Sequence, residues 1–289
     1  MLRRPTKTCL IAATPRSGSY WLAEAFYETS LLGDPQEYFL PAAQAAWRQD
    51  LGLPPEATYA RFVRAALAHS ATANGVAGAK LMWTHFQALA RSLREIDALA
   101  DLDDVTLADR FFPEVHYVHL VRRDTVRQAI SFYRAERSSS WWRLRDEPAA
   151  AAPSAAPAPQ APAPQAPAPP GEEHPFEPDF ARIHHIETML VQEAASWDAY
   201  FATTDRPILE LCYEEILGDR RSAVERALAL LGIDPPAGLE VPESRMLRQS
   251  DATTDEWASR YEELKPVLAA GSRPAPAEAA SASAGTSSR

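Results

Sequence analysis

Short apolar runs alternate with helical patterns along this chain. Four aliphatic runs are short enough to be buried strands, at residues 9–13, 75–82, 115–121 and 208–212. Apolar residues at helical spacing predict helices after residues 19 and 124, and over residues 86–100, 180–202, 221–231 and 256–264. Strands that alternate with helices are typical of βαβ units. The pattern therefore predicts an α/β fold with a central parallel sheet flanked by helices.

Two segments of biased composition interrupt this alternation. Residues 148–170 consist almost entirely of Ala and Pro, and residues 269–289 are rich in Ala, Ser and Pro. Neither segment offers the large apolar side chains that a packed core needs, which predicts a disordered insertion and a disordered tail. We therefore expect residues 1–147 and 171–268 to form a single domain.

The turn after the first strand has the composition of an anion-binding loop. It carries Arg16, Ser17, Gly18 and Ser19 directly before the first predicted helix. Backbone N–H groups at a helix start, hydroxyl groups and an arginine all favour a phosphate-like anion. The turn is P-loop-like, but Ala13 stands in place of the first glycine of a Walker A loop and Ser19 in place of its lysine. An ordinary connection with a solvated arginine is the alternative.

A second anion site is indicated near the end of another strand. Arg122 follows the apolar run at residues 115–121, and Ser131 lies nine residues further on, in the next predicted helix. Because the carboxyl ends of parallel strands share one edge of the sheet, Arg122 should lie near the first turn. Arg122 and Ser131 could share a phosphate there. Equally, Arg122 could pair with Asp124 while Ser131 faces solvent.

Three more side chains are candidates for chemistry at this edge. Glu37 lies in a turn beside Tyr38 and Phe39, and a carboxylate among aromatic groups suits proton abstraction. Lys80 interrupts an apolar strand, so its ammonium group must reach solvent, pair with a carboxylate or face an anion. His85 follows at the same edge. A glutamate on a surface loop is the alternative for Glu37.

Composition and charge exclude several classes of function. The 289 residues carry a net charge of −10, which argues against a general nucleic-acid binder. Cys9 and Cys212 lie in apolar runs, which predicts buried free thiols, and no Cys/His spacing predicts a metal site. No apolar run reaches transmembrane length and the first residues lack a signal-peptide pattern, so we expect a cytoplasmic protein.

Taken together, the motifs resemble those of a known family. The resemblance rests on residues 14–21, 33–39, 78–83, 117–124 and 248–257, with further similarity to the wider class at residues 211–217. In this order they resemble the Stf0-type family of bacterial trehalose 2-sulfotransferases, within the sulfotransferases that use 3′-phosphoadenosine 5′-phosphosulfate (PAPS). The resemblance covers residues 8 to about 264, apart from the Ala/Pro tract.

The resemblance implies a role for each motif. The turn formed by Arg16, Ser17, Gly18 and Ser19 would hold the 5′-phosphosulfate of PAPS, with Arg16 also stabilising charge during transfer. Arg122 and Ser131 would hold the 3′-phosphate, Arg248 would approach the nucleotide, and Glu37 would act as general base. In our mechanistic reading of the sequence, Lys80 helps to neutralise the transferring group. The acceptor would be a hydroxyl of a carbohydrate or glycolipid, such as a trehalose-like sugar. No metal is implied.

Some positions depart from the family pattern. Arg123 replaces a proline, Thr84 and His85 replace a polar pair, and the loop at residues 14–21 is closer to the wider sulfotransferase pattern. These departures leave the use of the nucleotide donor intact, but they leave the identity of the acceptor undetermined. Two other functions remain as alternatives, a P-loop-type small-molecule kinase and a catalytically inactive nucleotide-binding interaction protein. A homodimer is compatible with the sequence.

Overall fold

The computed structural model describes residues 4–138, 140–141, 177–246 and 251–271. The predicted insertion at residues 148–170 and residues 272–289 of the predicted tail lie outside these ranges. Their disorder and the domain boundaries drawn from them stay predictions.

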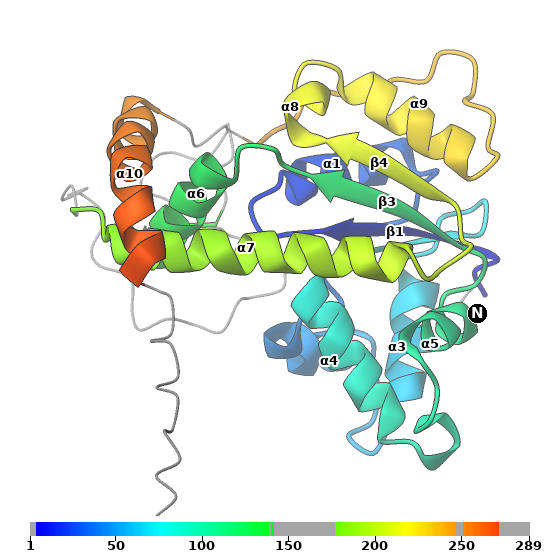
Figure 1. The fold of residues 1–289 in the computed structure, drawn as a ribbon. Helices are drawn as coiled ribbons and strands as arrows, with labels where there is room; N and C mark the ends of the chain where they lie inside the picture. Colours follow the sequence, from blue (N-terminus) through cyan, green and yellow to red (C-terminus); the bar gives the residue numbers. More distant parts are fainter. Residues whose placement is uncertain (1–3, 139, 142–176, 247–250, 272–289) are drawn as a thin grey trace, which may run out of the picture.

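A parallel sheet of four strands forms the centre of the molecule (Figure 1). Its strands lie in the order β2-β1-β3-β4, and all neighbouring pairs are parallel. Their bounds are β1 (Lys7–Ala13), β2 (Val76–Met82), β3 (Val115–Val121) and β4 (Ile208–Cys212). Each coincides with an apolar run. Nearly all residues of β1, β2 and β3 are buried, as strands covered on both faces require, whereas the edge strand β4 is buried only at Leu211 and Cys212. The predicted fold class is confirmed.

Helices cover both faces of the sheet. On one face lie α1 (Ser19–Thr29), the short α8 (Tyr213–Ile216) and α9 (Arg220–Leu230), and Figure 1 shows α8 and α9 above the sheet. The opposite face is covered by α3 (Tyr59–His69), α4 (Trp83–Arg94), α5 (Asp104–Phe111) and the long α7 (Phe180–Phe201). The 3₁₀ turn η1 (Pro41–Ala43) and the short α2 (Gln44–Asp50) precede α3, and the 3₁₀ turn η2 (Asp97–Leu99) lies between α4 and α5.

Some predicted helix bounds are wrong. The helix predicted over residues 86–100 begins three residues earlier, at Trp83, and ends at Arg94 before η2. The helix predicted over residues 256–264 is longer and forms α10 (Ala252–Gly271), because Asp251 accepts a hydrogen bond from Thr254 N at 3.0 Å and caps its start. Helices α2, α3 and α5 were not predicted from the pattern.

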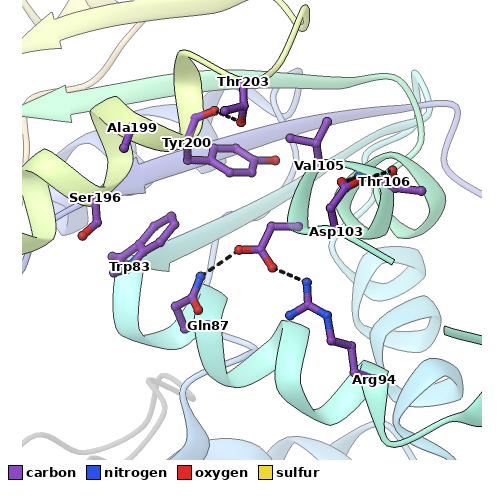
Figure 2. Close-up of a pocket in the computed structure, with 11 residues that line it drawn as sticks. Trp83, Gln87, Arg94, Asp103, Val105, Thr106, Ser196, Ala199, Tyr200 and Thr203 are labelled. Carbon is purple, nitrogen blue, oxygen red and sulfur yellow. Dashed lines mark hydrogen bonds and ion pairs between the residues drawn. The ribbon is translucent and has the colours of Figure 1, made fainter. Parts of the chain in front are cut away.

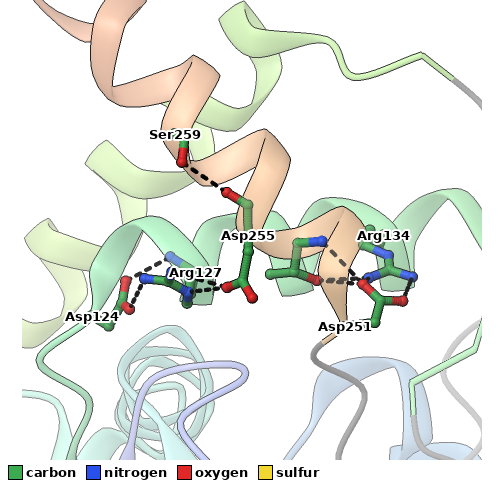
Figure 3. A network of polar contacts seen from close by, with 7 residues as sticks. Asp124, Arg127, Arg134, Asp251, Asp255 and Ser259 are labelled. Carbon is green, nitrogen blue, oxygen red and sulfur yellow. Dashed lines mark hydrogen bonds and ion pairs between the residues drawn. The ribbon is translucent and has the colours of Figure 1, made fainter.

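Helix α6 (Thr125–Ser138) packs beside α7 and is fixed by α10. Arg127 pairs with Asp255 at 2.9 Å, and Arg134 pairs with Asp251 at 2.7 Å, so two arginines of α6 reach the first turns of α10 (Figure 3). One residue before Arg134, the Tyr133 hydroxyl accepts from Asp179 N, directly before α7, at 3.2 Å. Two neighbouring elements therefore hold α6 in place.

The segment after α1 runs along the outer edge of β2. Lys80 N donates to Gln36 O at 3.1 Å, which extends the pairing of the edge strand. Gly33 has a φ of 79°, and a Cβ atom there would stand 2.1 Å from Gly78 N. Gly78 is also crowded, since its own Cβ atom would stand 2.9 Å from Pro35 N. This close approach of the two backbones fixes the position of the segment that carries Glu37.

Replacing Gly33 with Ala should lower the free energy of unfolding more than replacing Gly52 with Ala. Both glycines have positive φ, at 79° and 61°, so both variants carry the strain of a left-handed alanine, about 1–2 kcal/mol. Only at Gly33 does the new methyl group also collide with β2, which should add about 1–3 kcal/mol. Urea denaturation of the two variants checks the difference. Equal losses of stability would contradict the close approach.

Candidate functional site

The turn after β1 has an unusual backbone conformation. Arg16 has a φ of 64° and Gly18 a φ of 86°, so two residues of one short turn lie in the left-handed region. A Cβ atom at Gly18 would stand 2.5 Å from the ring of Tyr213, which directly follows β4. Only glycine fits at this position, because the turn passes against that ring.

The amino end of α1 opens into this turn. Gly18 caps the helix without a side-chain hydrogen bond, and the first turn of the helix contains no acidic residue. Ser17 Oγ donates to Thr14 O at 2.8 Å, so this hydroxyl group closes the turn instead of capping the helix. Ser19 is the first helical residue and is buried. Uncapped N–H groups and the helix dipole together favour an anion here.

Two arginines and a serine from different elements meet at the turn. Arg122 Nη1 donates to Arg16 O at 2.9 Å, and the Arg122 guanidinium lies 4.6 Å from the centre of the Tyr213 ring. Arg16 Nε donates to Ser131 Oγ at 3.0 Å, and Arg16 Nη1 donates to the carbonyl of Trp141. The structure therefore brings together Arg16, Arg122 and Ser131, as expected from their places at one edge of the sheet.

The approach of two guanidinium groups favours an anionic ligand. Burial and the nearby charge of Arg122 lower the pKa of Arg16 to about 10. Asp124, the alternative partner of Arg122, instead caps α6 by accepting from Arg127 N at 2.9 Å and pairs with Arg127 Nη1 at 2.8 Å. A multiply charged anion would offset the repulsion of the two arginines and accept hydrogen bonds from both.

Two residues that hold the turn in place were missed from the sequence. Gln128 of α6 is buried and donates from Nε2 to Thr14 Oγ1 at 2.8 Å and to Pro15 O at 2.7 Å. Trp197 of α7 donates from Nε1 to Ala13 O at 3.1 Å. An amide and an indole in amphipathic helices carry no local signal for these contacts. Only the packing of α6 and α7 against the end of β1 explains them.

Glu37 and Lys80 lie together beside α1. The Lys80 Nζ atom lies 3.7 Å from Glu37 Oε1 and 2.9 Å from the centre of the Tyr20 ring. The Tyr20 hydroxyl donates to Glu37 Oε2 at 2.6 Å. Glu37 is 7% exposed and Lys80 is 1% exposed, so the alternatives of a solvated loop glutamate and a lysine that reaches solvent are wrong. Tyr20 was missed, although it directly follows the anion-binding turn.

Several buried polar atoms near this edge lack a hydrogen-bond partner within the described ranges. They are Lys80 Nζ, His85 Nδ1 in the first turn of α4, and Glu193 Oε2 on α7. Burial lowers the pKa of Lys80 to about 8 and also lowers the pKa of His85, although the charge of Glu37 opposes both shifts. Burial raises the pKa of Glu193. Unsatisfied buried groups cost about 1–3 kcal/mol each, and their gathering here favours a polar ligand.

Arg248, the remaining predicted residue of the site, lies outside the described residues. Its place in the sequence is three residues before Asp251, which pairs with Arg134 of α6. Within the part of the chain that the structure describes, no group of three or more His, Cys, Asp or Glu residues could hold a metal ion. None of the described helices has the length and apolar character that a membrane crossing requires.

Comparison with known proteins places the chain in the class of sulfotransferases. Residues 8–263 match the family model described as Stf0 sulphotransferase. The chain belongs to the Stf0 sulphotransferase family, which confirms the resemblance carried by its motifs.

Two relatives with the name trehalose 2-sulfotransferase match nearly the whole chain. The protein from Mycobacterium tuberculosis (strain ATCC 35801 / TMC 107 / Erdman) is 28% identical over 294 residues, covering 92% of this chain and 98% of the relative. The protein from Mycolicibacterium smegmatis (strain ATCC 700084 / mc(2)155) is 27% identical over 282 residues, covering 87% of this chain and 93% of the relative. A solved structure, the sulfotransferase domain of the Synechococcus PCC 7002 olefin synthase, is 14% identical in sequence. The match covers 95% of this chain and 97% of the solved chain, with a TM-score of 0.37. This last likeness is too distant to bear on function.

Replacing Lys80 with Met should change how the free energy of unfolding depends on pH. Burial lowers the pKa of Lys80 to about 8 from its usual 10.5. Between these pH values the unfolded protein binds more protons than the folded protein, so Lys80 makes stability rise with pH. Relative to Lys80→Met, the parent should gain on the order of 3 kcal/mol between about pH 8 and about pH 10.5. Urea denaturation across this range checks the gain. Parallel pH profiles would show that the Lys80 pKa is not depressed.

Proposed function

We propose that this protein transfers a sulfuryl group from PAPS to a hydroxyl of a carbohydrate or glycolipid. The observation that carries the proposal is the meeting of Arg16, Arg122 and Ser131 at the uncapped start of α1, close to the buried pair of Glu37 and Lys80. Membership of the Stf0 sulphotransferase family supports the reaction type. The sugar acceptor is supported by the names of the two relatives.

The donor would be held by groups that bind anions without a metal. In this proposal the turn with Arg16, Ser17, Gly18 and Ser19 holds the 5′-phosphosulfate. Arg122 and Ser131 hold the 3′-phosphate, and Arg248 contributes from the C-terminal side. The fit rests on two guanidinium groups, of which Arg122 donates to the carbonyl of Arg16 and Arg16 donates to Ser131 Oγ, and on helix N–H groups that no side chain caps.

The transfer itself requires a base and a group that stabilises negative charge. In our proposal Glu37 accepts the proton of the acceptor hydroxyl, whose oxygen forms a new bond to sulfur. The bond between sulfur and the bridging oxygen of the donor breaks at the same time, and the electron pair stays on the departing phosphate. Arg16 and Lys80 stabilise the negative charge that gathers during this step. The Tyr20 hydroxyl, bonded to Glu37, orients the carboxylate.

Adenosine 3′,5′-bisphosphate should raise the melting temperature of the protein much more than ATP with Mg²⁺ does. The proposed site has two adjoining anion-binding sets, the turn with Arg16 and the pair of Arg122 and Ser131, which would each take one phosphate of the nucleotide, and the turn lacks the Walker A lysine that a triphosphate requires. Thermal denaturation with each nucleotide over a concentration series checks this. Equal stabilisation by the two nucleotides would favour the kinase alternative.

Arg122→Ala should weaken the binding of adenosine 3′,5′-bisphosphate by about 1.5–3 kcal/mol, because a charge-assisted hydrogen bond is lost. Arg123→Ala is the matched control, since Arg123 is the next residue and forms an exposed pair with Glu215 at 2.6 Å. Isothermal titration of both variants checks the difference. Equal affinities of the two variants would remove Arg122 from the donor site.

Glu37→Gln should lower turnover by about 10²- to 10⁴-fold, because the amide keeps the shape of the side chain but cannot accept the proton. The affinity for adenosine 3′,5′-bisphosphate should change little. The exposed Glu56 offers a control, and Glu56→Gln should transfer sulfate at the parental rate. Radiolabelled PAPS with a panel of sugars and glycolipids measures both. Near-parental turnover of Glu37→Gln would exclude Glu37 as the base and leave His85 as the next candidate.

A further inference from the structure

A pocket of about 810 Å³ lies between α4, α5 and α7, and two of its charged side chains are held by other groups of the protein (Figure 2). Asp104 accepts from Gln87 Nε2 at 3.0 Å and from Arg94 Nη2 at 2.6 Å, and Arg94 Nε donates to Leu102 O at 2.9 Å. These bonds stabilise the fold without a ligand. At the carboxyl edge of the sheet, by contrast, a carboxylate holds the backbone beside Arg122.

The connection between β3 and α6, residues 122–124, is held by one carboxylate of another element. Glu214 lies in the short α8, directly after Tyr213. Its Oε2 atom accepts from Arg123 N at 3.2 Å, and its Oε1 atom accepts from Asp124 N at 3.2 Å. Because both oxygens are used on consecutive N–H groups, a shift of the connection would break at least one of these bonds. The carboxylate therefore fixes the backbone on the C-terminal side of Arg122.

The residue before Glu214 contacts the other end of Arg122. The Arg122 guanidinium lies 4.6 Å from the centre of the Tyr213 ring, and its Nη1 atom donates to Arg16 O at 2.9 Å. Two consecutive residues of α8 thus hold the backbone and the guanidinium of the same arginine. Because a long side chain loses conformational entropy when it is fixed, an arginine that is held in advance binds an anion more tightly.

Glu214 is suited to this role because it keeps its charge and its direction. The Cys212 thiol donates to Glu214 Oε2 at 3.0 Å. Burial raises the pKa of Glu214, but hydrogen bonds from Cys212 and from the backbone of Asp124 and Arg123 outweigh burial and lower the pKa. The carboxylate is therefore ionised at neutral pH, and charge-assisted bonds to backbone N–H groups are stronger than neutral ones.

The rest of α6 has supports other than Glu214. Arg127 pairs with α10 at 2.9 Å (Figure 3), and Thr125 Oγ1 donates to Glu187 Oε1 of α7 at 2.7 Å. Loss of the Glu214 carboxylate should therefore leave α6 in place and loosen only the connection before it. Glu214 is also exposed, so a substitution there opens no cavity in the core.

We propose that Glu214 is a positioning residue of the donor site, which holds the connection after β3 so that Arg122 is directed at the 3′-phosphate of the donor. The proposal rests on the proposed function and deepens it, because it names a residue that acts on the nucleotide only through Arg122. Glu215, the next residue, is assigned no such role. It forms an exposed pair with Arg123 at 2.6 Å, and exposed pairs contribute little.

Glu214→Gln should lower the preference of the protein for a 3′-phosphate about two- to tenfold, the range that the ordering of one side chain spans. The amide keeps the shape of Glu214, but it accepts at one atom only and presents its NH₂ group to the other backbone N–H group. Isothermal titration of adenosine 3′,5′-bisphosphate and of adenosine 5′-monophosphate measures the preference as the ratio of the two dissociation constants. The affinity for adenosine 5′-monophosphate should stay at the parental value. Glu215→Gln, the matched control, should keep the parental affinity for both nucleotides.

The same titrations in an Arg122→Ala background test whether Glu214 acts through Arg122. Adding Glu214→Gln to Arg122→Ala should cause no further loss of preference. A parental preference in Glu214→Gln, beside a lowered one in Arg122→Ala, would overturn the positioning role and leave the donor site intact. Equal losses for both nucleotides, or a further loss in the double variant, would also overturn it, since the effect would not pass through Arg122. A parental preference in Arg122→Ala would overturn the donor site and this proposal with it.

Discussion

The burial of the Lys80 ammonium group inside the sheet is the constraint on which the rest of the site depends. A charged group that is 1% exposed is costly unless its surroundings offset the loss of water. Here the offset comes from the face of Tyr20 at 2.9 Å and from Glu37 Oε1 at 3.7 Å. Both neighbours must lie close to β2. Tyr20 is placed there by the first turn of α1, and Glu37 by the close backbone approach of Gly33 and Gly78.

Helix α6 organises the other half of the site. It carries Ser131 against Arg16 and Gln128 against the backbone of the turn, so the conformation of the turn depends on where α6 lies. The ion pairs with α10 and the contact with the start of α7 fix that position. Helices α6, α7 and α10, which are remote from the turn in the sequence, thus determine the direction in which the hydrogen-bond donors of the turn point. A rigid support of this kind lowers the reorganisation that accompanies binding.

The sequence predicted the parts of the fold that local pattern encodes. Strands β1, β2 and β3 appear as apolar runs because they are buried on both faces, and the edge that joins Arg16 to Arg122 follows from parallel pairing. Tyr20 and Gln128 escaped prediction because their roles arise from tertiary contacts between helices and the turn. The missed α3 is different, since the Thr58 cap and apolar residues at helical spacing were visible in the sequence.

The pairing of α6 with α7 has a consequence for how the gene encoding this protein can vary. Tyr133 bonds to both Glu177 O and Asp179 N, and Glu136 pairs with Arg182, so the chain leaves α6 and returns to α7 at neighbouring points. These contacts come only from residues up to Glu136 and from Glu177 onward, so the gene can gain or lose codons for the chain between them without removing any of these contacts.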